Sequence, residues 1–119
     1  MSKEIGNKGE ELAEKFLRSN GYDILTKNYH TRIGEIDIVA RDGAELVFTE
    51  VKTRTSQTFG LPQESVTKSK IRKLRQTALL YIAENNIKSS PFRIDVISIQ
   101  LEKTGKVKSV DHIKNILDA

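Results

Sequence analysis

Two carboxylates and a lysine are the residues best placed to do chemistry in this chain. Asp37 lies in one run of apolar residues, and Glu50 and Lys52 lie in the next, with Asp42-Gly43 between them. Two carboxylates that meet with a lysine beside them are typical of a site for a hard cation, because Mg²⁺ binds one or two carboxylates together with waters and phosphate oxygens. A solvated strand end with a Glu–Lys pair explains the same spacing equally well.

The segment that must position these side chains reads as a β-hairpin. Asp-Gly between two β-forming runs is a strong turn signal, because both residues tolerate positive φ. With Asp42 and Gly43 as the loop residues, Asp37 faces Phe48 across the pair, and Glu35 faces Glu50. One face then carries the charged side chains of Glu35, Asp37, Glu50 and Lys52. The other face carries the apolar side chains of Ile36, Ile38, Ala40, Val47 and Val51.

Length and composition narrow the class of protein. The 119 residues fit a single domain, residues 1–119. There is no long apolar run for a transmembrane helix and no visible signal peptide, so we expect a cytoplasmic protein without a membrane partner. The absence of cysteine excludes disulfides, thiolate metal sites and cysteine nucleophiles. The net charge of +4 leans toward an anionic partner.

Residues 5–20 predict an amphipathic helix that ends at Gly21. Its apolar arc consists of Ile5, Leu12, Ala13, Phe16 and Leu17. Gly6 and Gly9 fall on the same arc, which would let another backbone come close. Glu10 lies at the border of the arc, where it can look across the sheet or simply act as a favourable acid near the helix N-terminus.

Residues 67–86 predict a second helix with a basic first half. Its cations are Lys68, Lys70, Arg72, Lys73 and Arg75, with no acid among them. Cations at a helix N-terminus oppose the macrodipole, so a role in binding phosphate explains them better than a purely structural one. A solvated basic face is the alternative.

The rest of the chain supplies strands and one loop. We expect strands over residues 22–30, 91–100 and 107–113, and a loop over residues 53–65 in which Phe59 stacks on a base or pins the loop to the core. Arg93 and Asp95 share a strand face and are expected to pair with each other or with the second helix. His30 reads as a surface residue. The order helix, three strands, helix, two strands indicates an α/β fold with about five strands.

Five motifs together resemble the YraN family, small bacterial proteins in the Holliday-junction-resolvase-like branch of the restriction-endonuclease-like superfamily. The motifs are Gly9-Glu10, Gly34-Glu35-Ile36-Asp37, Phe48-Thr49-Glu50-Val51-Lys52-Thr53-Arg54, Phe59-Gly60-Leu61-Pro62 and Phe92-Arg93-Ile94-Asp95-Val96. The resemblance implies a restriction-endonuclease-like central mixed sheet flanked by two long helices. It differs from the superfamily pattern at Ile36, where proline is frequent.

The resemblance also implies roles for individual residues. Asp37 and Glu50, with the backbone carbonyl of Val51, would hold Mg²⁺ or Mn²⁺, and Lys52 would orient or activate water. Glu10 would bind a second metal directly or through water. Flanking phosphates would contact Arg54, Lys68, Lys70, Arg72 and Lys73.

The expected function is metal-dependent phosphodiester hydrolysis of DNA, with branched or otherwise structured DNA as substrate. The rival hypotheses are a catalytically inactive nucleic-acid-binding protein and an adaptor whose basic helix contacts an acidic protein. A homodimer is expected only from the resemblance to resolvases.

Overall fold

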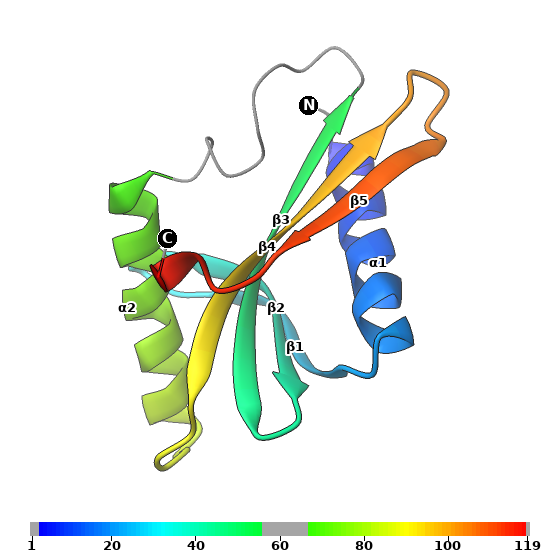
Figure 1. Cartoon of the computed structure of the whole chain (residues 1–119). Coiled ribbons are helices and arrows are strands. Elements are labelled where there is room, and N and C mark those ends of the chain that lie inside the picture. Colours follow the sequence, from blue (N-terminus) through cyan, green and yellow to red (C-terminus); the bar gives the residue numbers. More distant parts are fainter. Residues whose placement is uncertain (1–2, 56–66, 119) are drawn as a thin grey trace.

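The computed structural model describes residues 3–55 and 67–118 as two helices and a five-stranded sheet (Figure 1). Along the chain the elements are α1 (Lys3–Ser19), β1 (Asp23–His30), β2 (Glu35–Asp42), β3 (Glu45–Thr55), α2 (Lys68–Glu84), β4 (Phe92–Leu101), β5 (Val107–Ile113) and a short 3-10 turn, η2 (Ile116–Asp118). The predicted elements are all present. The third strand is longer than expected and runs to Thr55, into the segment predicted as a loop, while Phe59 lies outside the described residues.

The strands lie side by side in chain order, β1-β2-β3-β4-β5. Only β3 and β4 run parallel, and α2 belongs to the crossover between them; the other neighbours are antiparallel. The sheet is therefore mixed, with α1 covering one face and α2 the other (Figure 1). The predicted α/β fold with a mixed five-stranded sheet and two long flanking helices is confirmed.

Each helix seals its own half of the core. The α2 half is built mainly from Ile36, Val39, Leu46, Phe48, Leu74, Ala78, Tyr81, Ile94 and Val96. The α1 half is built mainly from Ala13, Leu17, Tyr22, Ile38, Ala40, Val47, Ile97, Ile99 and Leu101. Both faces of the central strands are covered, so β4 is buried along nearly its whole length and β3 is buried over residues 46–49. No helix in the described ranges is long and apolar enough to span a bilayer.

Glycines fix the position of α1. Gly21 has φ 86°, and its N–H donates to the Arg18 carbonyl while the N–H of Tyr22 donates to that of Leu17, the pattern of a Schellman cap. At Gly9 a Cβ would lie 1.8 Å from Thr53 Oγ1, so only glycine allows the helix this close to β3. β3 does approach the helix closely at Gly9, through the side chain of Thr53 and not through a backbone as expected, whereas Gly6 faces open space and the expectation is wrong there.

The predicted register of the central hairpin is wrong by two residues. The turn consists of Gly43 and Ala44, so Asp42 pairs with Glu45 and Val39, not Asp37, pairs with Phe48. Gly43 has φ 62°, and the first turn position is where a type II′ turn requires glycine. Asp42 therefore extends the strand instead of entering the turn.

The strict alternation along β2 breaks at Asp37. Ile38 packs in the α1 half of the core as expected, but Ile36 packs in the α2 half, so its predicted face is wrong. In a regular strand residues two apart share a face. The β2–β3 ladder has its last pair at Ile38 and Thr49, and the side chain of Asp37 accepts a hydrogen bond from the Val51 N–H at 2.7 Å. This local departure from pleating accounts for the change of face.

A buried polar cluster ties β4 and β5 together beneath α1. Asp95 has no solvent exposure and accepts hydrogen bonds from Arg93 Nε at 3.1 Å and from the Asn115 N–H at 2.9 Å. His112 Nε2 lies 2.7 Å from the same carboxylate, and Arg93 also donates to the Tyr22 hydroxyl at 2.6 Å. Of the two expected partners of Arg93 and Asp95, the first is observed: they pair with each other.

Candidate functional site

The chemistry-bearing residues cluster where β2 and β3 separate. Asp37 and Glu50 are the next residues on each strand after the last paired ones, Ile38 and Thr49. The Val51 N–H that would continue a regular ladder is instead taken by the Asp37 carboxylate. Because β2 and β3 no longer pair with each other beyond this point, side chains from the two strands and from a nearby helix can reach the space between them.

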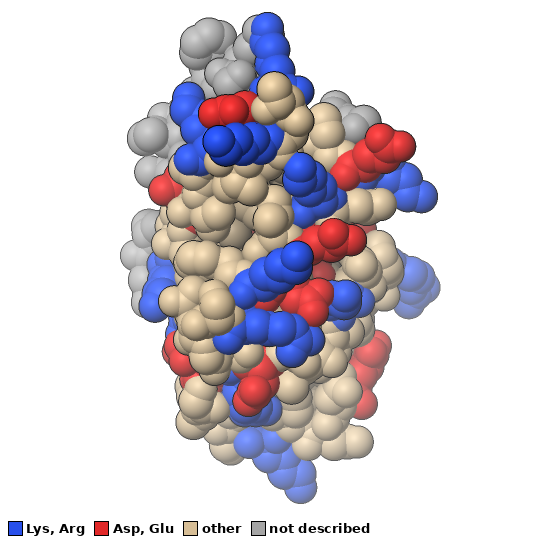
Figure 2. Space-filling model, turned by 90° about the vertical axis from the view of Figure 1, so that its right-hand side faces the viewer, with Lys and Arg blue, Asp and Glu red and all other residues tan. Residues whose placement is uncertain are grey.

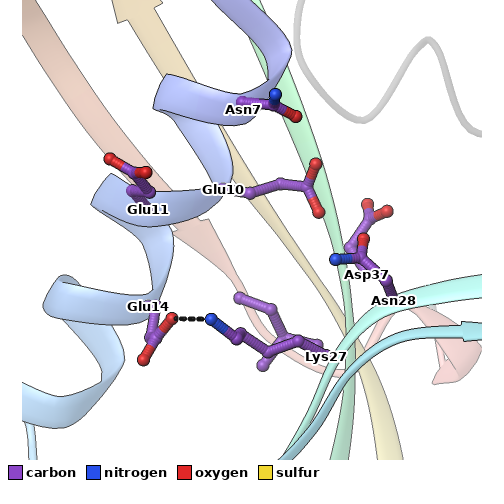
Figure 3. Close-up of a pocket in the computed structure, with 8 residues that line it drawn as sticks. Asn7, Glu10, Glu11, Glu14, Lys27, Asn28 and Asp37 are labelled. Atoms are coloured by element: carbon purple, nitrogen blue, oxygen red, sulfur yellow. Dashed lines mark ion pairs between the residues drawn. The ribbon is translucent and has the colours of Figure 1, made fainter. Parts of the chain in front are cut away.

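A cavity of about 210 Å³ lies between α1 and this strand end (Figure 3). Its lining consists of Asn7, Glu10, Glu11, Glu14, Lys27, Asn28, Asp37 and Ile38. The carboxylates of Glu10 and Asp37 point toward one another across it, whereas Glu11 points away (Figure 3). Glu14 forms an ion pair with Lys27, whose Nζ lies 2.9 Å from the Glu14 carboxylate.

The environment of Asp37 disfavours its charged form. Burial raises the pKa of Asp37 to about 6, and the charges of Glu10, Glu50 and Glu35 add to the rise, while the hydrogen bond from Val51 opposes it. Within residues 3–55 and 67–118, no lysine, arginine or histidine forms an ion pair with Asp37. The pKa of Glu10 is also raised, first by burial and then by Glu35. Lys27 and His30 act on Glu10 in the opposite direction, but burial and the neighbouring carboxylates still raise the pKa of Asp37 and Glu10 above their ordinary values.

Glu50 and Lys52 lie on the other side of the strand end. Lys52 Nζ is 3.0 Å from Glu50 Oε1, while Glu50 Oε2 is buried and accepts no hydrogen bond from the described residues. Glu50 lines a second cavity of about 170 Å³, shared with Gly34, Glu35, Lys70, Lys73, Leu74 and Thr77. The structure therefore brings Asp37 together with Glu10 under α1, and Glu50 together with Lys52 and two lysines of α2.

These donors suit a divalent cation that keeps part of its water shell. The described residues contain no ready-made group of three or more acidic or histidine side chains for a metal. Mg²⁺ does not require one, because it binds through one or two carboxylates and fills its remaining positions with water and substrate phosphate. The pair Glu10 and Asp37 meets that requirement, and the charge of nearby Glu50 also raises the pKa of Asp37. The expected ligand role of the Val51 carbonyl stays a prediction.

The positive charge of the chain is concentrated on α2. The helix holds five lysines and arginines and one acid, a net charge of +4, which equals the net charge of the whole chain. The cations Lys68, Lys70, Arg72, Lys73 and Arg75 are all exposed. Thr67 caps the helix by accepting a hydrogen bond from the Lys70 N–H at 3.2 Å. The face around α1 instead interleaves both signs of charge (Figure 2). Arg54 is half-buried on β3, beside Gln100 of β4.

Sequence reasoning missed several residues that shape the two cavities. Asn7 lies one helical turn before Glu10, a spacing that could have identified it. Asn28 adopts φ 53°, a conformation that asparagine tolerates better than most residues. Gly34 and Thr77 come together from distant parts of the chain, and no local signal links them.

The comparison with known proteins identifies the family. Residues 9–99 match the model described as Uncharacterised protein family UPF0102. The chain is 46% identical over 115 residues to the UPF0102 protein of Clostridium novyi, covering 97% of this chain and 96% of the relative. It is 47% identical over 116 residues to the UPF0102 protein of Carboxydothermus hydrogenoformans, covering 98% and 97% respectively. The matched span includes Glu10, Asp37, Glu50 and Lys52, and the chain belongs to family UPF0102, the YraN family that its motifs resemble.

Proposed function

We propose that this protein is a metal-dependent nuclease that hydrolyses phosphodiester bonds in structured DNA. The observation that carries the proposal is the Asp37 carboxylate, held at the point where β2 and β3 separate, facing Glu10 and lacking an ion-pair partner in the described part of the chain. Natural proteins rarely keep uncompensated carboxylates together unless a cation or a proton resides there.

The position of each residue suggests its role in the proposed reaction. Asp37 and Glu10 would hold a Mg²⁺ or Mn²⁺ ion from the α1 side. Glu50 would add a further negative charge near the ion from the α2 side. A bound divalent ion stabilises charge on the scissile phosphate and lowers the pKa of a bound water. Lys52, fixed by its 3.0 Å contact with Glu50, places an ammonium group beside the negative oxygens that develop in the reaction. The cations of α2 would bind neighbouring phosphates without reading sequence.

Carboxylate substitutions test the proposal. Purified Asp37→Ala and Glu50→Ala variants should lose cleavage of a DNA four-way junction in Mg²⁺ by about a hundredfold or more, while binding of the same DNA in EDTA persists. Glu10→Ala should weaken cleavage as well. Glu11→Ala is the matched control, since Glu11 follows Glu10 directly in α1 but points away from Asp37 (Figure 3). Unchanged cleavage by Asp37→Ala would refute the site.

The concentration of net charge on α2 favours one further candidate, a nucleic-acid-binding protein without catalysis. That function predicts binding that weakens steeply with salt and does not respond to Mg²⁺. It also predicts that the unaltered protein, freed of contaminating nucleases, leaves DNA intact in both Mg²⁺ and Mn²⁺. Cleavage that is abolished by EDTA and by Asp37→Ala would exclude it.

A further inference from the structure

The turn between β1 and β2 presents an apolar side chain to solvent. Ile33 is 44% exposed in this turn, which comprises residues 31–34. The N–H groups of Ile33 and Gly34 both donate to Thr31 Oγ1 at 3.1 Å, and the Thr31 N–H donates to the Gly34 carbonyl at 2.9 Å. The turn is therefore held in one shape, and Ile33 is displayed by a braced backbone.

This turn lies against the basic helix. A Cβ at Gly34 would come within 3.0 Å of Thr77 Oγ1 on α2, and Gly34 lines one cavity with Lys70 and Lys73. The turn, cyan in Figure 1, accordingly lies beside α2. Arg32, next to Ile33 in the turn, is also exposed. An apolar group thus stands next to a surface of concentrated positive charge.

The acids near this surface have partners of their own. Glu35 lies 3.0 Å from His30, and Glu50 lies 3.0 Å from the Lys52 ammonium group. Because Lys52 offsets the charge of Glu50, Glu50 lowers the positive charge around α2 less than an unpaired acid would. A polyanion that follows α2 would meet the turn without facing an isolated carboxylate at either of these positions.

We propose that Ile33 is an apolar wedge that contacts unstacked bases of a distorted nucleic acid while its phosphates follow α2. This inference rests on the nucleic-acid-binding part of the proposed function. A single apolar side chain beside cations suits a polymer that offers base faces and phosphates together, and such wedges act at base steps that are already open. Protein interfaces instead require a contiguous apolar core. The other exposed large apolar residues of the described ranges, Leu25, Leu79 and Val107, lie on three other elements.

The test compares two equally exposed residues on two DNA substrates. Ile33→Ala and its control Leu25→Ala, in which the replaced leucine is also 44% exposed, are measured by fluorescence anisotropy in EDTA, so that no cleavage is needed. On a duplex with an unpaired bulge, Ile33→Ala should bind about tenfold more weakly than the unaltered protein. On a fully paired duplex of equal length it should bind within about twofold. Leu25→Ala should match the unaltered protein on both, and Ile33→Leu should restore binding to the bulge.

Three results would overturn the inference. Equal affinity of Ile33→Ala and the unaltered protein for the bulge removes the wedge, even if the protein cleaves DNA. An equal loss on both substrates assigns Ile33 a general role without preference for open bases. Binding of polyglutamate that depends on Ile33, with no DNA binding, assigns the surface to an acidic protein. Loss of cleavage in Asp37→Ala tests the metal site only, and the role of Ile33 is decided by the binding measurements alone.

Discussion

Replacing Asp37 by asparagine should stabilise the metal-free protein at neutral pH. The half-buried carboxylate is charged at pH 7.5 although its surroundings favour the protonated form. Asparagine removes that charge, and its amide oxygen can still accept the Val51 hydrogen bond. The rise of the Asp37 pKa from 3.8 to about 6 corresponds to about 3 kcal/mol. Partial solvent exposure reduces the expected gain in unfolding free energy to about 1–3 kcal/mol.

The sign of the pH dependence follows from linkage. A carboxylate with a raised folded-state pKa binds its proton more tightly in the folded protein, so its stabilising contribution is fully present below the unfolded value of 3.8 and is lost as pH rises through about 6. The difference between Asp37→Asn and the unaltered protein should therefore shrink to about 1 kcal/mol or less at pH 4.5. Taking the difference cancels the contributions of carboxylates that do not interact with Asp37, including Asp95.

Urea unfolding at pH 4.5, 6.0 and 7.5 in EDTA measures the effect, with Asp23→Asn as the control because Asp23 is exposed on β1. If the site holds Mg²⁺ as proposed, saturating Mg²⁺ should stabilise the unaltered protein but not Asp37→Asn, because an ion that binds only the folded site stabilises the folded state. The reasoning is refuted if Asp37→Asn is less stable than the unaltered protein at pH 7.5. It is also refuted if the difference does not change between pH 4.5 and pH 7.5.

Three further predictions concern the scaffold and the basic helix. Gly9→Ala should lower the unfolding free energy by about 1–3 kcal/mol through overpacking against β3. Gly6→Ala should raise the unfolding free energy by up to about 1 kcal/mol, because a Cβ at Gly6 would meet open space. Equal effects of the two substitutions in thermal melts would contradict the close approach at Gly9. Asp95→Ala should lower the unfolding free energy by about 1–3 kcal/mol in urea unfolding, because the Asn115 N–H and His112 lose a buried acceptor while Arg93 keeps its contacts with Glu45 and Asp42. A loss below about 0.5 kcal/mol would contradict that role. Lys73→Gln should reduce the slope of log affinity for DNA against log salt by about one, with no change in slope excluding a phosphate contact.

The helices and their ends could be predicted because their signals are local. The apolar stripes and the glycine after α1 lie within a few residues of the structures they specify, and Gly21 forms the expected cap. In the central hairpin, local signals alone do not fix the position of the turn. Asp42-Gly43 correctly indicates a turn, but the choice between a turn that begins at Asp42 and one that begins at Gly43 depends on how the strands pack.

The strands that carry the candidate residues were predictable, but the arrangement of the side chains was not. Spacing places Asp37 and Glu50 on adjacent strands, which the structure shows. The alternation breaks at Asp37 because its side chain accepts the Val51 hydrogen bond. Asp37 and Glu50 line separate cavities because a different helix packs beside each of them. The partnership of His112 with Asp95 escaped sequence reasoning for the same reason, because β5 must pair with β4 before the two side chains meet.

The parallel pairing of β3 with β4 has a consequence for synthesis on the ribosome. Leu46 pairs with Phe92 and Thr55 with Leu101, so the centre of the sheet closes only after α2 and β4 have emerged. Until then a nascent chain carries Val47 and Phe48, both fully buried in the finished protein, on a strand with one open edge. Arrested chains that end shortly before residue 92 should therefore recruit chaperones more strongly than chains released at full length.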